Sequence, residues 1–493
     1  MFLLLYFILW CFRYPLACNM PCQLLRGPGT MLNDSQSLRG FLDMVEETYP
    51  EEVLRIREPV NTYLDITSLV FELEKAGRNP VVIYENVEGH SMPIITNVSG
   101  NRNLLAACLG VDTIDLPTAF RDRVRNYIPC EVVDEAPWQE VVIEEDSLDL
   151  TKLPIPFHFE VDAAPYITAG QISARDPVTG IDTTGFHRLM LKDKNRLGVS
   201  LHSRRRMYEF HRRAEKQGKA LPAVVTIGIH PLHYMGSMVY AYPPNIRKFE
   251  IIGGLFGEPY RLAKCGIADL EVPVGAEIII EGEILPEIKE PEGPFSEFTG
   301  YASYRSTQNV FKAHCIRMRH NAIYHSIVSG MSQDHILISC ITREGEILNA
   351  LKRNLPNVQA VHVPHQTCGA FFAFIKLNKT AEGEPHQAIL SALGTEFYTK
   401  YVVVVDEDID IFNINDVMWA IATRVRAEAD IVFIPGSKGA VLDPTSDPKT
   451  FTVTKMGIDA TRPLSQDFAE RLTISKKQRA RVRNILETAG IKL

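Results

Sequence analysis

The sequence lacks several features that would assign it at once to a broad functional class. It has no run of about 20 apolar residues, the length that a membrane-spanning helix needs. It also lacks an excess of basic residues, because 52 Lys and Arg stand against 60 Asp and Glu, for a net charge of −8. A protein that binds a nucleic-acid backbone needs a basic surface. We therefore expect neither a membrane span nor a nucleic-acid partner.

Cysteine pairs at metal-binding or redox spacing are also missing. The nine cysteines are scattered along the chain, and no two of them have the Cys-x-x-Cys spacing of zinc ribbons and redox sites. Their odd number argues against a disulfide framework and favours a reducing compartment. We therefore expect free thiols in a cytoplasmic protein.

Several common site motifs are absent as well. The chain contains no Gly-x-Ser-x-Gly, no P-loop and no Gly-x-Gly-x-x-Gly between a strand and a helix, so hydrolase and dinucleotide-binding interpretations have no support. His362 and His365 lack the further spaced ligands of a metal site. The acidic loop Asp406–Asp410 begins like a calcium loop but lacks the Gly at its sixth position and the Glu at its twelfth.

Length and local pattern divide the chain into five segments. A chain of 493 residues is long enough for two to four domains of roughly 100–200 residues each. Helical and strand patterns alternate at both ends, whereas strand patterns dominate the middle. The predicted segments are an N-terminal extension 1–36, an α/β domain 37–150, a strand-rich domain 151–340, an α/β domain 341–460 and a C-terminal helix within 461–493.

The N-terminal extension has two interpretations. Its apolar stretch Phe2–Phe12 is too short to cross a bilayer, and no basic segment precedes it as in a secretory signal peptide. We expect a dispensable extension, with Met20 or Met31 as alternative starts. A targeting segment is the remaining alternative.

Hydrophobic periodicity predicts the individual elements. The unbroken apolar run Tyr401–Val405 is typical of a strand buried on both faces of a sheet, and Asn415 with Asp416 is expected to cap the helix that follows. The predicted helices are Ser37–Glu47, Asn103–Leu109, Met207–Gln217, Arg343–Leu351, Pro385–Leu393, Val417–Val425 and Ser475–Thr488. The other predicted strands are Pro80–Tyr84, Thr168–Ala174, Gly185–Leu191, Val224–Ile229, Glu277–Leu285, Phe311–Met318 and Ala370–Ile375.

Two carboxylates stand close together in the stretch Glu292–Glu297. Gly293 and Pro294 exclude a continuous helix, and the strand-like flanks predict a bend at a sheet edge that aims both glutamates at one point. Two carboxylates in one pocket cannot both ionise freely, so one acquires a raised pKa and can donate a proton near neutral pH. A solvated polar loop is the alternative for an isolated pair.

Arg188 is the candidate cation for this pair, because it interrupts an apolar strand. A guanidinium keeps a neighbouring carboxylate ionised and binds a substrate carboxylate through two parallel hydrogen bonds. The candidate catalytic residues are therefore Arg188, Glu292 and Glu297.

Four stretches together resemble the UbiD family of reversible decarboxylases: Gly185–Arg188, Ala263–Pro273, Glu292–Tyr301 and Val404–Arg424. The resemblance covers roughly residues 38–463. It implies an α+β fold with a central, flavin-reductase-like split β-barrel that binds prenylated FMN, an N-terminal α/β part and a C-terminal α/β domain that dimerises. A homodimer or higher homo-oligomer and a flavin prenyltransferase that supplies the cofactor are the implied partners.

The resemblance also implies roles for the three charged residues. Glu297 corresponds to the proton donor, while Arg188 and Glu292 hold the substrate carboxylate and orient that donor. The implied reaction is non-oxidative: the azomethine-ylide form of the flavin adds across the double bond beside the carboxylate, CO2 leaves and the remaining carbon is protonated.

The chain departs from this family where the flavin phosphate is held. The resemblance implies Asn, His and Glu ligands to a divalent ion such as Mn²⁺, with K⁺ nearby, but Thr183, Ser203–Arg206 and Lys248 stand at these places. Our hypothesis is that arginine and lysine neutralise the phosphate directly. The alternatives are that Glu250 still ligates a metal, and that Arg204–Arg206 is a solvated turn. The candidate cofactor-binding residues are Thr183, Arg188, Arg204, Arg205, Lys248 and Glu250.

The substrate is less closely defined by the sequence. Met331, Gln333 and His335 align with the family's substrate-side loop, where His335 either contacts the substrate or caps a helix. The stretch Val363–Gly369 lacks the lysine that resembles a phenol-handling group in gallate and protocatechuate decarboxylases. We expect an aromatic, heteroaromatic or α,β-unsaturated carboxylic acid. The alternatives are a hydroxybenzoate-type decarboxylase of the same family and a non-catalytic flavin-binding accessory protein.

Overall fold

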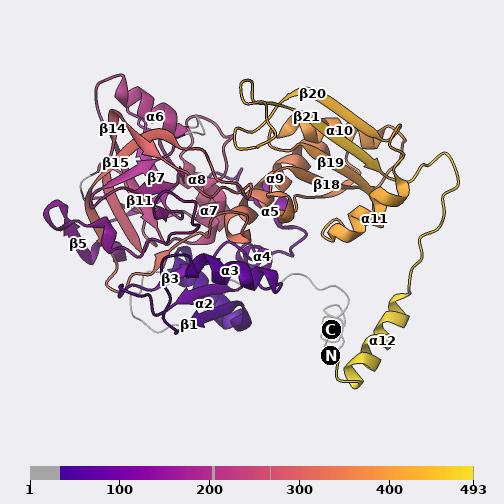
Figure 1. Cartoon of the computed structure of the whole chain (residues 1–493), viewed down its shortest axis with the longest axis horizontal. Coiled ribbons are helices and arrows are strands. Elements are labelled where there is room, and N and C mark those ends of the chain that lie inside the picture. The colour runs from indigo at the N-terminus through magenta and orange to yellow at the C-terminus, as the bar shows by residue number, and fades with distance from the viewer. Residues whose placement is uncertain (1–33, 202–205, 267, 492–493) are drawn as a thin grey trace, which may run out of the picture. The chain divides into compact units, whose positions relative to one another are not determined.

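The computed structural model describes residues 34–201, 206–266 and 268–491 (Figure 1). The predicted N-terminal extension lies almost entirely outside these residues, as do the candidate cofactor-binding residues Arg204 and Arg205. None of the helices in these three stretches has the length and apolar content that are needed to span a bilayer.

The first part of the described chain builds a four-stranded sheet in the order β1-β2-β3-β16. Helix α2 packs Leu38, Phe41 and Val45, which follow the predicted amphipathic period, against β2. The last strand, β16, comes from a distant part of the chain and pairs in parallel with β3, so this sheet is completed from the central segment. The elements are α2 (Leu38–Thr48), β1 (Val53–Ile56), α3 (Asp65–Lys75), β2 (Val81–Tyr84), β3 (Ile94–Thr96), α4 (Arg102–Cys108), α5 (Leu116–Arg123) and β16 (Tyr324–His325).

A nine-stranded antiparallel sheet forms the centre of the molecule. Its order is β6-β9-β10-β15-β14-β11-β7-β8, with β5 paired to β15. Its core includes Leu197, Val225, Ile280 and Phe311, all fully buried. The expected α+β class with a split barrel is confirmed. The strands are β5 (Val141–Glu144), β6 (Tyr166–Ile167), β7 (Gln171–Arg175), β8 (Asp182–Phe186), β9 (Leu189–Leu191), β10 (Arg196–Val199), β11 (Leu221–Ile227), β14 (Ile278–Glu292) and β15 (Ser306–Met318).

Three helices and a small sheet pack around these strands. Helix α6 contacts β14, while α7 and α8 both contact β8, and this arrangement places the beginning of α8 beside the strand that leads to Arg188. The elements are α6 (Arg206–Glu215), α7 (Pro231–Ser237), α8 (Lys248–Phe256), β4 (Glu131–Val133), β12 (Arg261–Lys264) and β13 (Glu271–Pro273).

The C-terminal part builds a five-stranded sheet in the order β17-β18-β19-β21-β20. Val402 and Val404 of β19 pack in one apolar cluster, and Val403 and Val405 pack in another, so the strand is buried on both faces as its apolar run predicts. The elements are α9 (Gln333–Lys352), β17 (Val358–His362), β18 (Phe372–Leu377), α10 (Glu384–Thr395), β19 (Tyr401–Asp406), α11 (Ile414–Arg424), β20 (Ile431–Lys438), β21 (Thr452–Ala460) and α12 (Lys476–Thr488).

Two local predictions are corrected by the structure. The predicted strand Gly185–Leu191 is divided into β8 and β9, because the chain breaks from the sheet around Arg188. The N-cap of α11 is Asn413, whose side chain accepts a hydrogen bond from the backbone N–H of Asn415 at 3.1 Å. The predicted cap, Asn415 with Asp416, therefore lies two to three residues too far along the chain.

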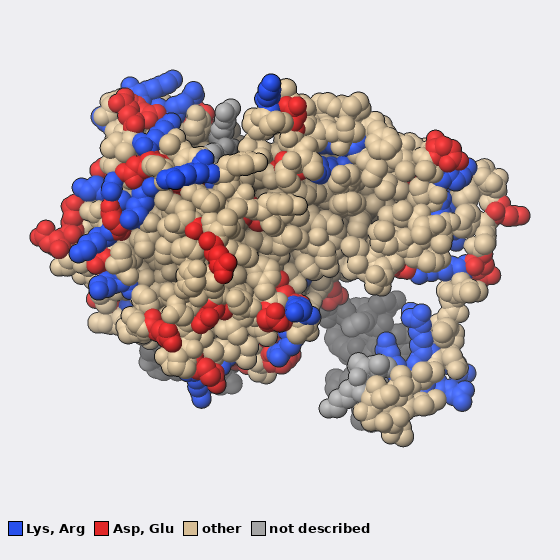
Figure 2. All heavy atoms as spheres, in the orientation of Figure 1, with Lys and Arg blue, Asp and Glu red and all other residues tan. Residues whose placement is uncertain are grey.

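The distribution of charged side chains and the state of the cysteines agree with what the composition predicts. Lysine and arginine are interspersed with aspartate and glutamate on the visible face, apart from the blue side chains on α12 (Figure 2). Helix α12 buries none of its residues. The six cysteines within the described residues are free thiols, as expected.

Gly282 gives a test of how the central sheet is packed. It lies at an irregularity of the β14–β15 pairing, and a Cβ added there would lie 2.1 Å from the carbonyl oxygen of Lys312. Gly282→Ala should therefore lower the free energy of unfolding by about 1–3 kcal/mol, as measured by denaturant or thermal unfolding. The control Gly394→Ala, in α10 and facing open space, should be stabilising by about 0.5–1 kcal/mol. Equal stability of the Gly282 variant and the wild type would contradict this packing.

Candidate active site

The structure brings together the three charged residues predicted to be catalytic. Arg188 lies between β8 and β9, Glu292 ends β14, and Glu297 follows in the next bend. The Nε and Nη2 atoms of Arg188 donate to the two carboxylate oxygens of Glu292, each at 2.8 Å, and Nη1 donates to Glu297. One guanidinium thus connects both carboxylates.

The bend that carries Glu297 is closed by its own hydrogen bonds. Gly293 has a φ of +83°, a conformation that glycine adopts without strain. Ser303 donates its backbone N–H to the carbonyl of Phe295 at 2.7 Å, and Glu297 donates its own to the carbonyl of Tyr301 at 3.0 Å. The loop therefore folds back on itself and fixes the direction of the Glu297 side chain.

Two residues that the sequence did not single out hold this loop from outside. Asp162 accepts a hydrogen bond from the backbone N–H of Ser296 at 2.7 Å. The ring of Tyr166 lies 4.6 Å from that of Phe295, and the Arg188 guanidinium lies 5.0 Å from the Phe295 ring on which it stacks. No local motif could reveal these contacts, because they join residues more than a hundred positions apart.

Burial sets the electrostatics of the cluster. Glu292 is fully buried and Glu297 is 8% exposed. Burial raises the pKa of Glu297; the positive charge of Arg188 opposes this shift and the neighbouring Glu292 adds to it. Glu292 holds Arg188 through two hydrogen bonds, whereas Glu297 accepts only one from it, so the two-point ion pair is the one with Glu292. Glu297 therefore keeps its proton to a higher pH than an ordinary glutamate does.

A partly open stretch of the sheet leads to this cluster. Residues 185–188 are partly exposed although their neighbours on both sides are buried, and a Cβ added to Gly185 would meet no atom within 4 Å. Gln171 is paired with Phe186 of this stretch, and Thr226 is paired with Gln171. These three side chains share one face of the sheet, and a side chain at Gly185 would point to the other face. The buried amide of Gln171 and hydroxyl of Thr226 have no hydrogen-bond partner among the described residues. Such orphaned polar atoms fit a planar cofactor with hydrogen-bonding edges.

The residues expected at the phosphate site do not fit a divalent metal ion. Lys248 is buried and carries an ammonium group, which has no lone pair to offer a metal. Glu250 accepts a hydrogen bond from the backbone N–H of Arg247 at 3.1 Å, at the start of α8. Within residues 34–201, 206–266 and 268–491, no three His, Cys, Asp or Glu side chains gather as a metal site requires.

Two of the predicted substrate-side residues lie near the loop that carries Glu297. A Cβ added to Gly300 would lie 2.9 Å from the sulfur of Met331. His335 lies in the first turn of α9, whose N-cap is Ser332 rather than the histidine, and its ring Nδ1 is 2.9 Å from the carbonyl of Gly330. Burial lowers the pKa of His335, so its ring is neutral near pH 7.

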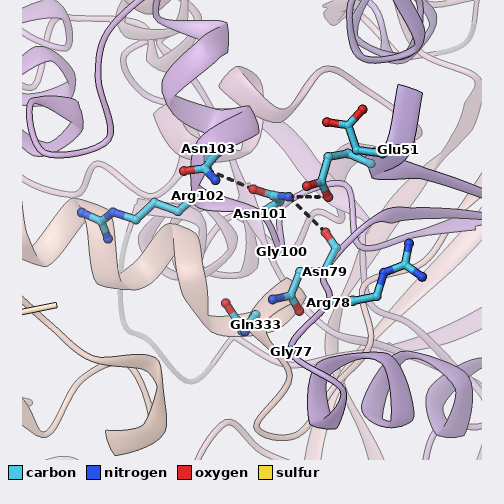
Figure 3. A pocket seen from close by; sticks show the side chains of 10 residues that line it. Glu51, Gly77, Arg78, Asn79, Gly100, Asn101, Arg102, Asn103 and Gln333 are labelled. Carbon is cyan, nitrogen blue, oxygen red and sulfur yellow. Dashed lines mark hydrogen bonds between the residues drawn. The ribbon is translucent and has the colours of Figure 1, made fainter. Parts of the chain in front are cut away.

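Gln333 lies on a different cavity (Figure 3). This cavity has a volume of about 440 Å³ and a polar lining that includes Glu52, Arg78 and Asn101. The Asn101 side chain donates to Glu52 at 2.9 Å. The lining contains none of the three candidate catalytic residues, so the structure does not bring Gln333 to them.

Aromatic residues of the C-terminal part contact the loop that carries Glu297. The ring of Phe298 lies 6.1 Å from that of Phe371 and 6.0 Å from that of Tyr398. The thiol of Cys368 is 3.9 Å from the carbonyl oxygen of Thr299. The sequence identified the loop but not the aromatic residues Phe371 and Tyr398 that pack beside it.

Comparison with known proteins agrees with this architecture. The chain matches the N-terminal, Rift-related and C-terminal domains of 3-octaprenyl-4-hydroxybenzoate carboxy-lyase, the UbiD family, over residues 48–124, 131–332 and 336–460. It is 32% identical to anhydromevalonate phosphate decarboxylase of Methanothermobacter thermautotrophicus, over 87% of this chain and 97% of the relative. It is 33% identical to the enzyme of the same name from Methanosarcina mazei, over 86% and 96%.

A solved relative shares the fold. The UbiD-class enzyme HmfF from Pelotomaculum thermopropionicum, in complex with FMN, is 34% identical, with a TM-score of 0.86 over 91% of this chain and 99% of that one. An evolved dimeric form of HmfF in complex with prFMN, also 34% identical, has a TM-score of 0.82 over 90% and 98%. From its arrangement of charged residues and from these matches along most of its length, the chain belongs to the UbiD family of carboxy-lyases.

Proposed function

We propose that this protein is a prenylated-FMN-dependent decarboxylase that releases CO2 from an α,β-unsaturated carboxylic acid. The buried cluster of Arg188, Glu292 and Glu297 carries the proposal, because it combines a carboxylate-binding cation with a carboxyl group of raised pKa. A non-catalytic flavin-binding protein would have no use for a proton donor in this place.

Two observations support prenylated FMN as the cofactor: the ligands of the solved relative HmfF and the partly open part of the central sheet. HmfF has been solved with FMN and with prFMN, and the partly open residues 185–188 beside the orphaned amide of Gln171 provide room and hydrogen-bonding groups for such a cofactor. When bound, it supplies the electron sink for the charge that departing CO2 leaves behind. The proposal includes the domain division predicted from the sequence, a flavin prenyltransferase as supplier and a homodimer.

The residues of the chain itself would bind and orient the substrate and protonate the product. Arg188 would orient the substrate carboxylate with its guanidinium, while Glu292 keeps that guanidinium in place. Glu297 would give its proton to the carbon that has lost CO2. The rings of Tyr166 and Phe295 exclude water from the cluster, which strengthens these electrostatic interactions.

An unsaturated acid that carries a phosphate group is the first substrate candidate. The name of the two curated relatives, anhydromevalonate phosphate decarboxylase, describes a dehydrated and therefore unsaturated acid of this kind. Aromatic and heteroaromatic acids are the second class, since the family description names a hydroxybenzoate carboxy-lyase. The missing lysine in Val363–Gly369 disfavours a phenolic acid.

The experiment that tests this function is coexpression with a flavin prenyltransferase. The purified protein, shielded from light and then exposed to air, should carry prenylated FMN at about one per chain by mass and absorption. It should release CO2 from a phosphorylated alkenoic acid in preference to furoic, indole carboxylic and hydroxybenzoic acids. Protein that holds plain FMN or none, and is inactive on the whole panel, would instead be an accessory protein.

Glu297 gives a direct mutational test. Glu297→Gln should keep flavin binding but lower kcat by about 10²–10⁴-fold, because the amide cannot donate the proton. Glu290→Gln is the matched control: it lies on β14 two residues before Glu292, and its carboxylate pairs with Arg196 and Lys192. The control should retain wild-type turnover. Unchanged turnover in the Glu297 variant would remove this residue from the mechanism.

The raised pKa of Glu297 predicts a particular pH profile. Only the protonated acid can donate, so kcat should fall as the pH rises through this pKa. In Glu292→Gln the negative neighbour is absent, which lowers the pKa of Glu297; the alkaline limb of the residual activity should therefore move to lower pH. A limb that stays in place would show that another group titrates.

A further inference from the structure

Three side chains from three elements meet at Tyr242. The Thr183 hydroxyl of β8 is 3.3 Å from the Tyr242 hydroxyl. The guanidinium carbon of Arg206, the first residue of α6, lies 3.7 Å from the centroid of the ring, and the Lys248 Nζ, at the first residue of α8, lies 4.7 Å from it. One aromatic ring thus gathers a hydroxyl and two cations.

Arg206 and Lys248 both donate hydrogen bonds to backbone carbonyls. Arg206 donates to the carbonyls of Pro243 at 2.8 Å and Ile246 at 3.2 Å, and it forms no ion pair within the described residues. Lys248 donates to the carbonyl of Ser237 at 3.0 Å and is 5% exposed. Carbonyl oxygens satisfy N–H donors but carry no full negative charge. Two positive charges beside one aromatic ring favour the binding of an anion near them.

The nearby carboxylates are used by another arginine. Asp182, the residue before Thr183, accepts from Arg247 Nε at 2.9 Å, and Glu271 accepts from the same guanidinium at 2.7 Å. Glu250 accepts from the Arg247 backbone. Each of these three carboxylates therefore accepts a hydrogen bond from Arg247, and no three His, Cys, Asp or Glu side chains of the described residues gather as a metal site requires.

The cations lie at a useful distance from the catalytic cluster. Thr183 and Arg188 are separated by five residues of mostly extended chain, which span at most about 17 Å, a distance of the order of the length of a flavin mononucleotide. We propose that Thr183, Arg206 and Lys248 bind the flavin phosphate directly, without the divalent ion that the resemblance implies. Guanidinium and ammonium groups are common phosphate ligands. This inference rests on the proposed flavin cofactor and deepens it.

The test compares FMN with riboflavin, which lacks the phosphate. Purified full-length protein is treated with EDTA, analysed for metals and titrated with each flavin by fluorescence quenching, with and without Mn²⁺. The metal content should be far below one per chain, FMN should bind more tightly than riboflavin, and Mn²⁺ should change neither affinity. FMN binding that is lost with EDTA and restored by Mn²⁺ would overturn the proposal.

Substitutions separate the phosphate contact from folding. Arg206→Gln and Lys248→Met should each weaken FMN binding about 10–100-fold and leave riboflavin binding unchanged. Arg212→Gln is the matched control, since this exposed arginine lies on the same helix and pairs with Glu209; its FMN affinity should equal that of the wild type. Equal losses for both flavins would indicate a structural role and overturn the assignment. If the buried Lys248 variant does not fold, the Arg206 variant decides.

A reverse design adds a gain-of-function readout. The triple variant Thr183→Asn, Arg206→His and Lys248→Glu restores the residue types that the resemblance implies as metal ligands. Its FMN binding should become dependent on Mn²⁺, and FMN binding that stays independent of metal would count against the proposed positions. Dependence of the wild type on Mn²⁺ would overturn this inference and leave the decarboxylase proposal intact, whereas failure to bind FMN at all would overturn both.

Discussion

The ion pairs of Arg188 with two buried glutamates are the interaction on which the proposed chemistry depends. A guanidinium that grips Glu292 with two hydrogen bonds is held in one orientation, and it then meets Glu297 with its remaining nitrogen. Removing either glutamate would leave the other to compensate this charge in a site with little water. The position of the Arg188 guanidinium therefore affects how tightly Glu297 holds its proton.

The fold forms the cluster of Arg188, Glu292 and Glu297 by bringing distant segments of the chain together. The long strand β14 ends at Glu292, and a loop closed on itself continues to Glu297. Arg188 arrives from the break between β8 and β9, and the beginning of β8 lies beside Tyr242 and the two cations around it. A single strand thus connects the proposed phosphate site to the proposed catalytic site, which explains how one extended ligand can reach both.

The sequence was sufficient to predict the features that depend on local residue patterns. The apolar run of β19, the bend after Glu292 and the family motifs were all readable, and with them the three charged residues. Asp162, Tyr166 and Tyr242 were not, because their roles come from contacts with residues far away in the chain that no periodicity reports. The position of Gln333 on a separate cavity was likewise set by tertiary packing rather than by its place in a motif.

The most direct test of this account is the protonation state of Glu297, measured by infrared difference spectroscopy of the wild type against Glu297→Gln. The account predicts a protonated carboxyl band in the wild type that persists to a higher pH than that of an ordinary glutamate, fades as the pH is raised further and is absent from the variant, since burial beside Glu292 raises the pKa of this acid. A spectrum without such a band, or a band that persists in the variant, would contradict the assignment of Glu297 as the proton donor.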